Sequence, residues 1–361
     1  MIAMASPDHP PVYLNAIGTA VPDHDIHATF IGWARERLPE REHKLFDRMA
    51  TRAAIRHRWS VLPQGAGSPV GDGGFYAGAS HPGTAARMQF YAEAAPVLAL
   101  DAVTALAGQV AIDGVTHLVV ASCTGFVAPG IDQIVARELG LAASVERTLI
   151  GFMGCYAAVA ALRTARHIVR SQPEARVLVV TVELSTLHLQ AVNELEPLLA
   201  MLQFGDGAAA ALVSAEPRGL MLGQPFATTL DASDQLIRWD ITDTGFAMHL
   251  SGEVPGRIGT ALSDSALVAQ ITGGAGAGEI DAWAVHAGGR SILDAVEHAL
   301  ALDAQALADS RAVLVDNGNM SSATLMFVLA RMLARDTVKR GVALAFGPGL
   351  AAEGFAFGPH G

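Results

Sequence analysis

Short apolar runs that end in glycine-rich or polar turns alternate along the chain with stretches of small residues. Four runs have the length and character of buried strands: 119–123, 176–181, 282–286 and 341–345. Two stretches of small residues favour helices, one after Cys155 and the other after Asn319. The pattern therefore predicts an α/β protein in which strands and several helices are buried.

The same order of elements occurs twice. Gly-Cys-Tyr-Ala-Ala at Cys155 and Gly-Asn-Met-Ser-Ser-Ala at Asn319 occupy equivalent places. Each follows a strand-and-loop element and precedes a further strand that leads to a glycine turn. We therefore predict a duplicated α/β unit, with an N-terminal half of residues 1–218 that carries the cysteine and a C-terminal half of residues 219–361. The halves are expected to meet near residues 215–223.

Cys155 is the first candidate for chemistry. It follows an apolar stretch and a glycine turn, and it precedes a helical run of small residues. The unpaired N–H groups and the dipole at a helix N-terminus favour a negative charge. We therefore predict a thiolate with a lowered pKa, as a covalent nucleophile requires. The alternative for a lone cysteine is a buried structural thiol.

His286 and Asn319 strengthen the catalytic interpretation. His286 ends a short apolar strand at a glycine-rich turn, where a histidine is more often a satisfied core or turn residue. Asn319 alone is also explained as a helix cap, because asparagine bonds the free N–H groups there. A cysteine, a histidine and an asparagine that all stand at such junctions favour one shared catalytic site.

The motifs around these residues resemble the thiolase superfamily of condensing enzymes and, within it, the bacterial type of type III (chalcone-synthase-like) polyketide synthases. The similarity runs from about residue 12 to the C-terminus. Cys155, His286 and Asn319 stand where the family has its nucleophile, its histidine and the asparagine of Gly-Asn-Met-Ser-Ser. Phe204-Gly205-Asp206-Gly207-Ala208 matches its gatekeeper phenylalanine, and Phe346-Gly347-Pro348-Gly349-Leu350 matches its C-terminal glycine loop. The resemblance implies a thiolase-like, duplicated αβαβα layered fold in an obligate homodimer.

The resemblance also implies a reaction. A starter from acyl-CoA is held on Cys155 as a thioester, and malonyl-CoA is decarboxylated to an enolate whose oxygen accepts hydrogen bonds from His286 and Asn319. Repeated condensation and cyclisation would give an alkylpyrone or a resorcinol- or phloroglucinol-type product. His286 is also expected to form an ion pair with the thiolate and to lower its pKa further.

Three other functions compete with this one. A ketoacyl-ACP synthase III-like enzyme, which condenses once on acyl carrier protein, shares the three residues but typically carries Gly-Asn-Thr-Ser. A papain-like hydrolase also uses cysteine, histidine and asparagine, but the sequence around Cys155 differs from its local signature. A non-catalytic lipid-binding homologue is disfavoured because all three residues are present.

The family's substrate pocket is where this sequence departs from the plant enzymes. Trp239 replaces a glycine and His188 a threonine, so both are expected to narrow the cavity. Met248 replaces a second gatekeeper phenylalanine and is expected to adapt around a chain. Cys123 stands in place of a threonine. The expected pocket residues are Phe204, Met248, Cys123, Trp239, His188 and Ser321.

A basic cluster lies on a helix that we predict over residues 40–54. Lys44, Arg48 and Arg52 are spaced four apart and therefore share one face. A solvated charged face is one interpretation. The resemblance implies instead a phosphate clamp for coenzyme A, to which we also assign Gly288 and Gly289. Arg48 and Arg52 align with basic residues of the family, whereas Lys44 is one residue out of register.

Composition narrows the choice of partners. The net charge of −11 argues against nucleic acid or an anionic membrane surface as the main partner. With 51% hydrophobic and 16% charged residues, the chain suits a large core and an oligomer interface. The apolar segment 97–122 is interrupted by Asp101, Gln109 and Asp113, so we expect no membrane span.

Residues 1–12 lack a basic start and an apolar core, and the chain has two cysteines, so we expect no signal peptide, a cytoplasmic location and no disulfide. No metal and no cofactor beyond the acyl-CoA and malonyl-CoA substrates is expected.

Overall fold

The computed structural model describes residues 10–64, 69–71, 73–77, 81–335 and 337–359 of the 361-residue chain, so most of the segment 1–12 lies outside the described residues. The first half contributes strands β1 (Tyr13–Ala20), β4 (His117–Ser122), β5 (Glu146–Gly151), β6 (Val177–Leu184) and β7 (Asp206–Ser214). The second half contributes β8 (Leu220–Thr229), β11 (Ala282–Val285), β12 (Gly341–Gly347) and β13 (Ala351–Pro359). Within the described residues these nine strands form one mixed sheet.

Strand pairing shows the duplication directly. In the first half β4 and β6 are parallel, while β6–β7 and β7–β1 are antiparallel. In the second half β11 and β12 are parallel, while β12–β13 and β13–β8 are antiparallel. β5 is an extra edge strand, parallel to β4. The halves join where β1 pairs with β8 at Tyr13↔Met221 and Leu14↔Leu220. The division at 218/219 falls in the connection between β7 and β8, and we keep it as a proposal.

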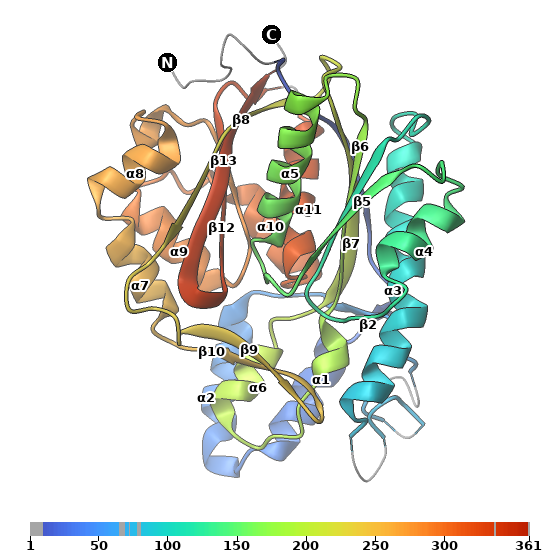
Figure 1. Ribbon diagram of the computed structural model, residues 1–361. Coiled ribbons are helices and arrows are strands. Elements are labelled where there is room, and N and C mark those ends of the chain that lie inside the picture. Colours follow the sequence, from blue (N-terminus) through green and yellow to red (C-terminus); the bar gives the residue numbers. More distant parts are fainter. Residues whose placement is uncertain (1–9, 65–68, 72, 78–80, 336, 360–361) are drawn as a thin grey trace.

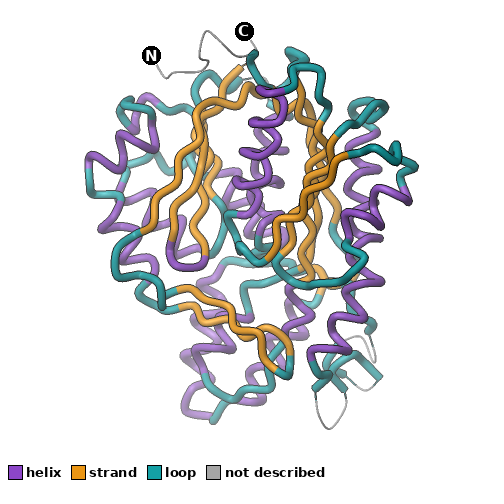
Figure 2. The backbone as a smooth tube through the Cα atoms, in the orientation of Figure 1, coloured by secondary structure: helices purple, strands orange, loops and turns teal. Residues whose placement is uncertain are grey.

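Helices form the other layers. The central pair, α5 (Ala157–Ser171) and α11 (Ser322–Leu333), lies between the two half-sheets, with strands on either side (Figures 1 and 2). α3 (Thr84–Ala107) and α4 (Ile131–Glu138) lie outside the first half. Outside the second half lie α7 (Val254–Ala261), α8 (Ser265–Thr272) and α9 (Arg290–Ala299), while α10 (Ala308–Asn317) lies nearer the centre and contacts α11 and α9. Alanine-rich α5 buries most of its residues, because small side chains allow close packing on both half-sheets.

A smaller group of elements packs below this body in Figure 1. It contains α1 (His27–Arg37), α2 (Glu40–Ala53), α6 (Leu195–Met201) and the hairpin β9 (Ile237–Thr242)–β10 (Gly245–Leu250). Short β2 (His24–Asp25) and β3 (Trp59–Ser60) form a second pair, and three single turns are η1 (Ser185–His188), η2 (Ala277–Glu279) and η3 (Pro348–Leu350). The helix predicted over 40–54 is confirmed as α2.

Among the described residues, α3 is the one helix that is long and apolar enough to cross a bilayer. It packs instead on β1, β6 and β7, and its buried face belongs to the core. Gly18 of β1 allows this contact, since a Cβ at that position would lie 2.1 Å from the backbone nitrogen of Leu106. α3 is therefore a core helix, although the sequence prediction overlooked that residues 84–107 meet the length and composition of a span.

Candidate active site

Cys155 lies at the N-terminal end of α5, one residue before the cap Tyr156, so its predicted place at a helix N-terminus is confirmed. Gly154 before it has φ of 80°, a left-handed conformation that favours glycine. A Cβ at Gly154 would lie 2.3 Å from Cδ of Pro348, and one at Gly347 would lie 3.4 Å from the Cys155 nitrogen. The C-terminal glycine loop of the second half therefore presses directly on the cysteine turn of the first half.

The ionisation of Cys155 differs from the sequence prediction. Burial raises the pKa of the thiol to about 12, opposed by side-chain hydrogen bonds with Ser321 and Asn319, and the nearby Glu183 carboxylate raises it further. The predicted lowering of this pKa is wrong, because desolvation of the charged form outweighs the stabilisation of the thiolate by the helix terminus and by the Ser321 and Asn319 side chains. Cys155 therefore rests as a thiol near neutral pH.

His286 follows β11, and its backbone N–H donates to the carbonyl oxygen of Leu344 at 2.8 Å. The ring is buried, and neither Nδ1 nor Nε2 has a hydrogen-bond partner among the described residues. Burial lowers the pKa of His286 to about 3, so the ring is neutral. The expected resting ion pair with Cys155 is thus wrong as well. Two buried, unpartnered ring nitrogens instead remain for a ligand.

Asn319 is held through its backbone and both ends of its side chain. Its backbone bridges to the segment 203–205, where the Phe204 gatekeeper lies. Its Oδ1 accepts from the Ser321 backbone N–H at 2.9 Å, and its Nδ2 donates to the Gly288 carbonyl at 3.1 Å. The Asn319 side chain also lowers the pKa of the Cys155 thiol, against the larger effect of burial. The N-cap of α11 is Ser321, two residues after Asn319, so the interpretation of Asn319 as the helix cap is wrong. Asn319 instead orders the turn that leads into α11.

Sequence reasoning missed a buried carboxylate between the two halves. Glu183 of β6 accepts hydrogen bonds from Oγ1 of Thr124 at 2.9 Å, from the Cys123 backbone N–H at 3.0 Å and from the Ser322 hydroxyl. Burial raises the pKa of Glu183 to about 7. The signal that could have found it is a glutamate inside an otherwise apolar strand, since buried charged groups need partners.

Cys123 lies in the loop after β4. Its Sγ accepts the Gly154 backbone N–H at 2.9 Å and contacts the Gly154 carbonyl oxygen at 3.4 Å. Burial raises the pKa of its thiol well above the ordinary value. Cys123 was expected in the pocket wall, but these contacts place it as a support of the cysteine turn. Both cysteines are free thiols.

Two cavities adjoin the segment that runs from α6 to Phe204. The inner cavity, of about 240 Å³, is lined mainly by apolar side chains and includes four predicted pocket residues: Phe204, His188, Trp239 and Met248. Cys123 and Ser321 do not line it. The outer cavity, of about 520 Å³, is lined by residues of α2, α6, α7 and the start of α9. Cys155, His286 and Asn319 line neither of these two cavities.

His188 and Trp239 belong to an aromatic cluster in the wall of the inner cavity. The His188 ring stacks on Phe246 with centroids 4.2 Å apart, and Trp239 lies edge-on to His188 at 5.7 Å. His188 Nδ1 accepts the Phe246 backbone N–H at 3.0 Å, so its Nε2 carries the proton and donates to the Thr124 carbonyl at 2.8 Å. Burial lowers the pKa of His188 to about 3, which keeps this tautomer neutral. The other members are Phe126 and Phe152.

The predicted coenzyme A residues are only partly brought together. Arg52 lines the outer cavity beside Arg290, whose Nη1 donates to the Arg52 carbonyl at 3.3 Å. Lys44 and Arg48 are exposed on α2 and do not line this cavity. Arg290 was missed, although it directly follows a Gly-Gly turn and begins helix α9.

The two glycines of that turn serve the site through the backbone. The Gly288 carbonyl holds Nδ2 of Asn319, and the Gly288 N–H donates to the His286 carbonyl at 2.9 Å. A Cβ at Gly289 would lie 2.2 Å from Oε1 of Gln203. Neither glycine lines the outer cavity. The structure therefore gives Gly289 a close-packing reason and Gly288 a backbone hydrogen-bonding role, and neither involves coenzyme A.

Comparison with known proteins agrees with this geometry. The families described as "Chalcone and stilbene synthases, N-terminal domain" and "C-terminal domain" match residues 3–217 and 222–358. The chain is 35% identical over 286 residues to "Alpha-pyrone synthesis polyketide synthase-like Pks18" of Mycobacterium tuberculosis, covering 75% of this chain and 72% of that protein. It is 37% identical over 294 residues to bisdemethoxycurcumin synthase of Oryza sativa subsp. japonica, covering 75% and 73%.

Among solved structures, PKS-I from the brown alga Ectocarpus siliculosus matches with a TM-score of 0.88 and 27% identity, over 98% of this chain and 100% of that one. The chain therefore belongs to the chalcone and stilbene synthase family. It is a type III polyketide synthase, an acyltransferase with the thiolase-like fold, and the resemblance inferred from its motifs is confirmed.

Proposed function

We propose that this type III polyketide synthase loads an acyl group from acyl-CoA onto Cys155 and extends it by repeated decarboxylative condensation with malonyl-CoA. One observation carries the assignment: the Asn319 side chain, which acts on the ionisation of the Cys155 thiol, is tied through Gly288 to the turn of His286, whose two ring nitrogens are buried and unpartnered. A nucleophile, a proton acceptor and an amide donor thus meet where the two halves join.

Loading starts from a neutral Cys155 thiol and a neutral His286 ring. Because the pKa of Cys155 is raised and that of His286 is lowered, the thiol keeps its proton until a thioester is present. His286 then accepts the proton as sulfur attacks the starter carbonyl, and it returns the proton to the departing coenzyme A thiolate. The carbon–sulfur bond to coenzyme A breaks, and the bond to Cys155 forms.

Extension needs stabilisation of an enolate. Malonyl-CoA loses carbon dioxide, and the electron pair left on carbon is delocalised onto the thioester oxygen. A neutral His286 with hydrogen on Nε2 and the Asn319 amide both donate to that oxygen, and burial strengthens such bonds. The enolate carbon then attacks the acyl thioester, which breaks its bond to the Cys155 sulfur and leaves the extended chain as a coenzyme A thioester. The Cys155 sulfur attacks that thioester, and coenzyme A leaves before another round.

The outer cavity is the proposed entrance for coenzyme A. Arg52 and Arg290 line it together, and guanidinium groups suit phosphate oxygens. We keep Arg48 and Lys44 as contacts of an extended diphosphate beyond this cavity. Arg290 is the stronger assignment, because it stands at the first position of α9, where the helix N-terminus also favours a phosphate.

The product class we propose is an alkylpyrone made from a fatty acyl starter. The similarity to an alpha-pyrone synthesis protein supports it, while comparable similarity to a curcuminoid synthase supports a resorcinol- or phloroglucinol-type ring as the second candidate. Incubation with labelled malonyl-CoA and a panel of acyl-CoA starters, followed by mass analysis, tests the proposal. Products with two or more extensions support it, whereas arrest after one extension would favour the single-condensation alternative.

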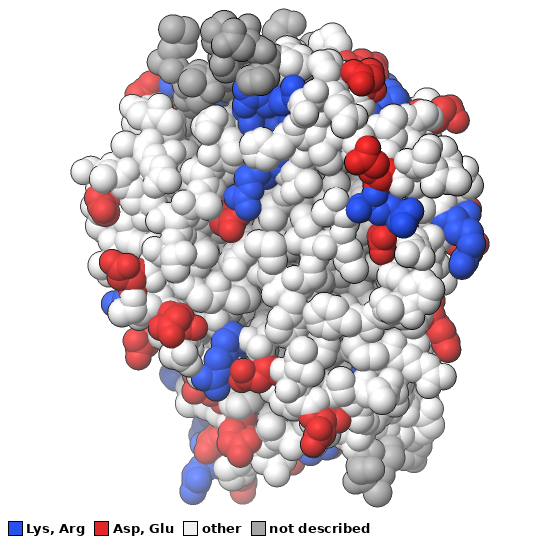
Figure 3. All heavy atoms as spheres, in the orientation of Figure 1, with Lys and Arg blue, Asp and Glu red and all other residues white. Residues whose placement is uncertain are grey.

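We also propose that the enzyme is a homodimer that covers the edge strand β5. An uncovered strand edge is a site of association, and here Leu149 and Phe126 are each 44% exposed beside it. In Figure 3 the middle of this face is largely uncharged. A Leu149→Lys variant should become monomeric in analytical ultracentrifugation, while Leu45→Lys on α2, 38% exposed, should leave the dimer intact. The cytoplasmic location remains a prediction.

A further inference from the structure

The end of α10 leads directly to Asn319. α10 ends just before Gly318, whose φ of 67° turns the chain one residue before Asn319. The last carbonyl groups of a helix have no partner within that helix. The Gly318 N–H donates to the Leu314 carbonyl at 3.0 Å. The next two carbonyls, of Val315 and Asp316, accept hydrogen bonds from a distant part of the chain, and these bonds fix the point from which the chain enters the Asn319 turn.

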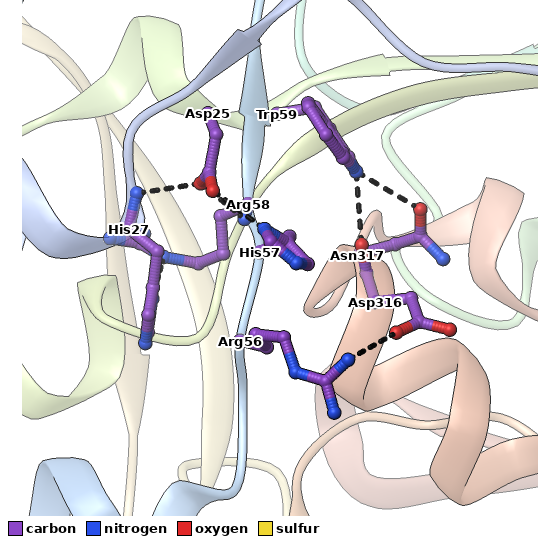
Figure 4. A network of polar contacts seen from close by, with 8 residues as sticks. All are labelled: Asp25, His27, Arg56, His57, Arg58, Trp59, Asp316 and Asn317. Atoms are coloured by element: carbon purple, nitrogen blue, oxygen red, sulfur yellow. Dashed lines mark hydrogen bonds and ion pairs between the residues drawn. The ribbon is translucent and has the colours of Figure 1, made fainter.

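The donors to these carbonyls belong to the segment 56–59, which we call the strap. Its first two backbone N–H groups donate to the Val315 carbonyl at 2.7 and 3.2 Å. The indole Nε1–H of Trp59 donates to the Asp316 carbonyl at 3.0 Å. Figure 4 shows the indole ring reaching the end of α10. The strap therefore satisfies the end of this helix as a capping residue would.

Asp25 anchors the strap on its other side. Oδ1 of Asp25 accepts the Arg58 backbone N–H at 3.1 Å, and Oδ2 bonds Nδ1 of His57 at 2.7 Å. The His57 ring stacks on the Trp59 ring, with centroids 5.6 Å apart and 18° between the ring planes. The indole is therefore held on its face by His57 and at its N–H by the end of α10 (Figure 4).

The strap also packs on the segment that pairs with Asn319. The Asn319 N–H donates to the Gln203 carbonyl at 2.8 Å, and the Asn319 carbonyl accepts the Gly205 N–H at 3.1 Å. A Cβ at Gly205 would lie 3.4 Å from the backbone nitrogen of Trp59. The strap, this segment and the Asn319 turn are thus closely packed, and little open space is present to absorb a displacement of Trp59.

We propose that Trp59 is a positioning residue for decarboxylation. Its indole N–H fixes the end of α10, and the fixed helix end holds the Asn319 amide where the enolate oxygen develops. A small displacement of such a donor lowers the rate strongly. Trp59 lines neither the inner nor the outer cavity, so it acts through Asn319 rather than on the substrate. The inference rests on the proposed function, because that function makes Asn319 an enolate donor.

Trp59→Phe tests the inference, because it keeps an aromatic ring beside His57 and removes the N–H donor. The kcat for malonyl-CoA decarboxylation, measured as release of labelled carbon dioxide, should fall about fivefold, as for the loss of one hydrogen bond. KM should change little, and the acyl adduct on Cys155, measured by intact-protein mass, should persist. A purely structural role would instead lower the melting temperature and leave the kcat of the folded enzyme unchanged.

A double-mutant cycle shows whether Trp59 acts through Asn319. In the Asn319→Ala background the donor that Trp59 positions is absent, so adding Trp59→Phe should cause no further loss of kcat. Substitutions that act independently would instead multiply their effects. The full fivefold loss in that background would therefore overturn the inference.

Trp33→Phe and Asn317→Ala are the matched controls. Trp33 is also half-buried and lies outside the strap, so Trp33→Phe should decarboxylate at the wild-type rate. Asn317→Ala removes Oδ1, which lies 3.2 Å from the indole nitrogen, but it keeps the bond from Trp59 to the Asp316 carbonyl. It should therefore also stay near the wild-type rate. An equal loss of kcat in Trp33→Phe would overturn the specific role of Trp59.

If Trp59→Phe does not fold, Asp25→Asn takes its place in the same cycle. It weakens the bond that holds His57 and should slow decarboxylation about twofold, but not in the Asn319→Ala background.

The outcomes separate this inference from the proposed function. An unchanged kcat in folded Trp59→Phe would overturn the inference and leave the polyketide synthase function intact. A wild-type enzyme that releases no carbon dioxide from malonyl-CoA, or Asn319→Ala as fast as the wild type, would instead contradict the proposed function.

Discussion

The two duplicated halves position their catalytic residues by different means. In the first half the backbone conformation positions the catalytic residue. Gly154, with φ of 80°, turns the chain so that Cys155 lies at the start of α5. In the second half Gly318, with φ of 67°, makes a comparable turn, but Asn319 is additionally fixed by hydrogen bonds at both ends of its side chain. The nucleophile thus depends on chain geometry, and its partner depends on a polar network.

This difference explains why neither half forms a site alone. The side chains that lower the pKa of Cys155, Ser321 and Asn319, belong to the other half, and so does the loop of Gly347 and Pro348 that lies against the cysteine turn. Glu183 links the halves a second time, because it accepts a hydrogen bond from Ser322 of the second half. Duplication has therefore produced two copies of a strand-to-helix junction that hold different and complementary chemical groups.

Removing the nucleophile should have the largest effect. A serine hydroxyl at position 155 is a poor acyl acceptor, so Cys155→Ser should abolish polyketide formation and the acyl adduct while the melting temperature stays near that of the wild type. Intact-protein mass spectrometry after incubation with acyl-CoA measures the adduct. Cys123→Ala is the matched control, since the chain has only two cysteines, and it should still acquire the adduct. An unchanged yield from Cys155→Ser would remove this residue from the mechanism.

Breaking the polar network of the second half should cost less. Asn319→Ala removes one enolate donor and should slow malonyl-CoA decarboxylation by roughly two to three orders of magnitude, by analogy with an oxyanion-hole donor. Loading of Cys155 should persist, because the thiol and His286 remain. Release of labelled carbon dioxide measures decarboxylation separately from loading.

Asn317→Ala is a control two residues away. The Asn317 side chain bonds Trp59 and the Val313 carbonyl rather than Cys155, so this variant should decarboxylate at nearly the wild-type rate. Preserved decarboxylation with lost loading in Asn319→Ala would reverse the roles assigned here.

Glu183, which links the two halves, should make the free energy of unfolding depend on pH. Burial raises the pKa of Glu183 from its ordinary 4.5 to about 7, so within this window the folded protein keeps a proton that the unfolded chain has lost. The free energy of unfolding contributed by Glu183 therefore falls as pH rises, by about 1.4 kcal/mol per unit, and levels off above about pH 7.

Glu183→Gln lacks this titration and nearly matches the shape of the side chain. Urea unfolding of both proteins at several pH values should show wild-type stability declining relative to the variant across the window. His188 and His286, whose pKa values burial lowers, give the opposite trend at acidic pH, but they are common to both proteins and cancel in the difference. Parallel pH profiles would mean that Glu183 does not change its ionisation on folding.

The sequence predicts the strand and helix ends that carry the catalytic residues far better than the burial and hydrogen bonding of those residues. Apolar periodicity and glycine turns located Cys155, His286 and Asn319 at strand and helix ends, because local chain geometry determines those places. The direction of the Cys155 pKa shift was predicted wrongly, since burial depends on tertiary packing that local sequence does not determine. The hydrogen bonds that hold the buried Arg58, to His27, Met201 and Phe204, are likewise a tertiary property that spacing along the chain does not indicate.

A substitution in the wall of the inner cavity should have the smallest effect on the reaction rate and the clearest effect on the products. Trp239 is half-buried on β9, opposite Met248 of β10, and it lines the inner cavity. Trp239→Gly should enlarge that cavity and shift the product distribution, with one fixed starter, toward bulkier or further extended chains. Its cost in stability should stay below the roughly 3–5 kcal/mol expected for a fully packed tryptophan, because one face of the ring borders a cavity.

Trp33→Ala, also half-buried but outside the cavity wall, provides the matched control and should change stability without changing the products. Product masses and melting curves of both variants distinguish the two roles: an unchanged product set from Trp239→Gly with a sharply lowered melting temperature would make Trp239 a core residue and contradict its role in setting chain length.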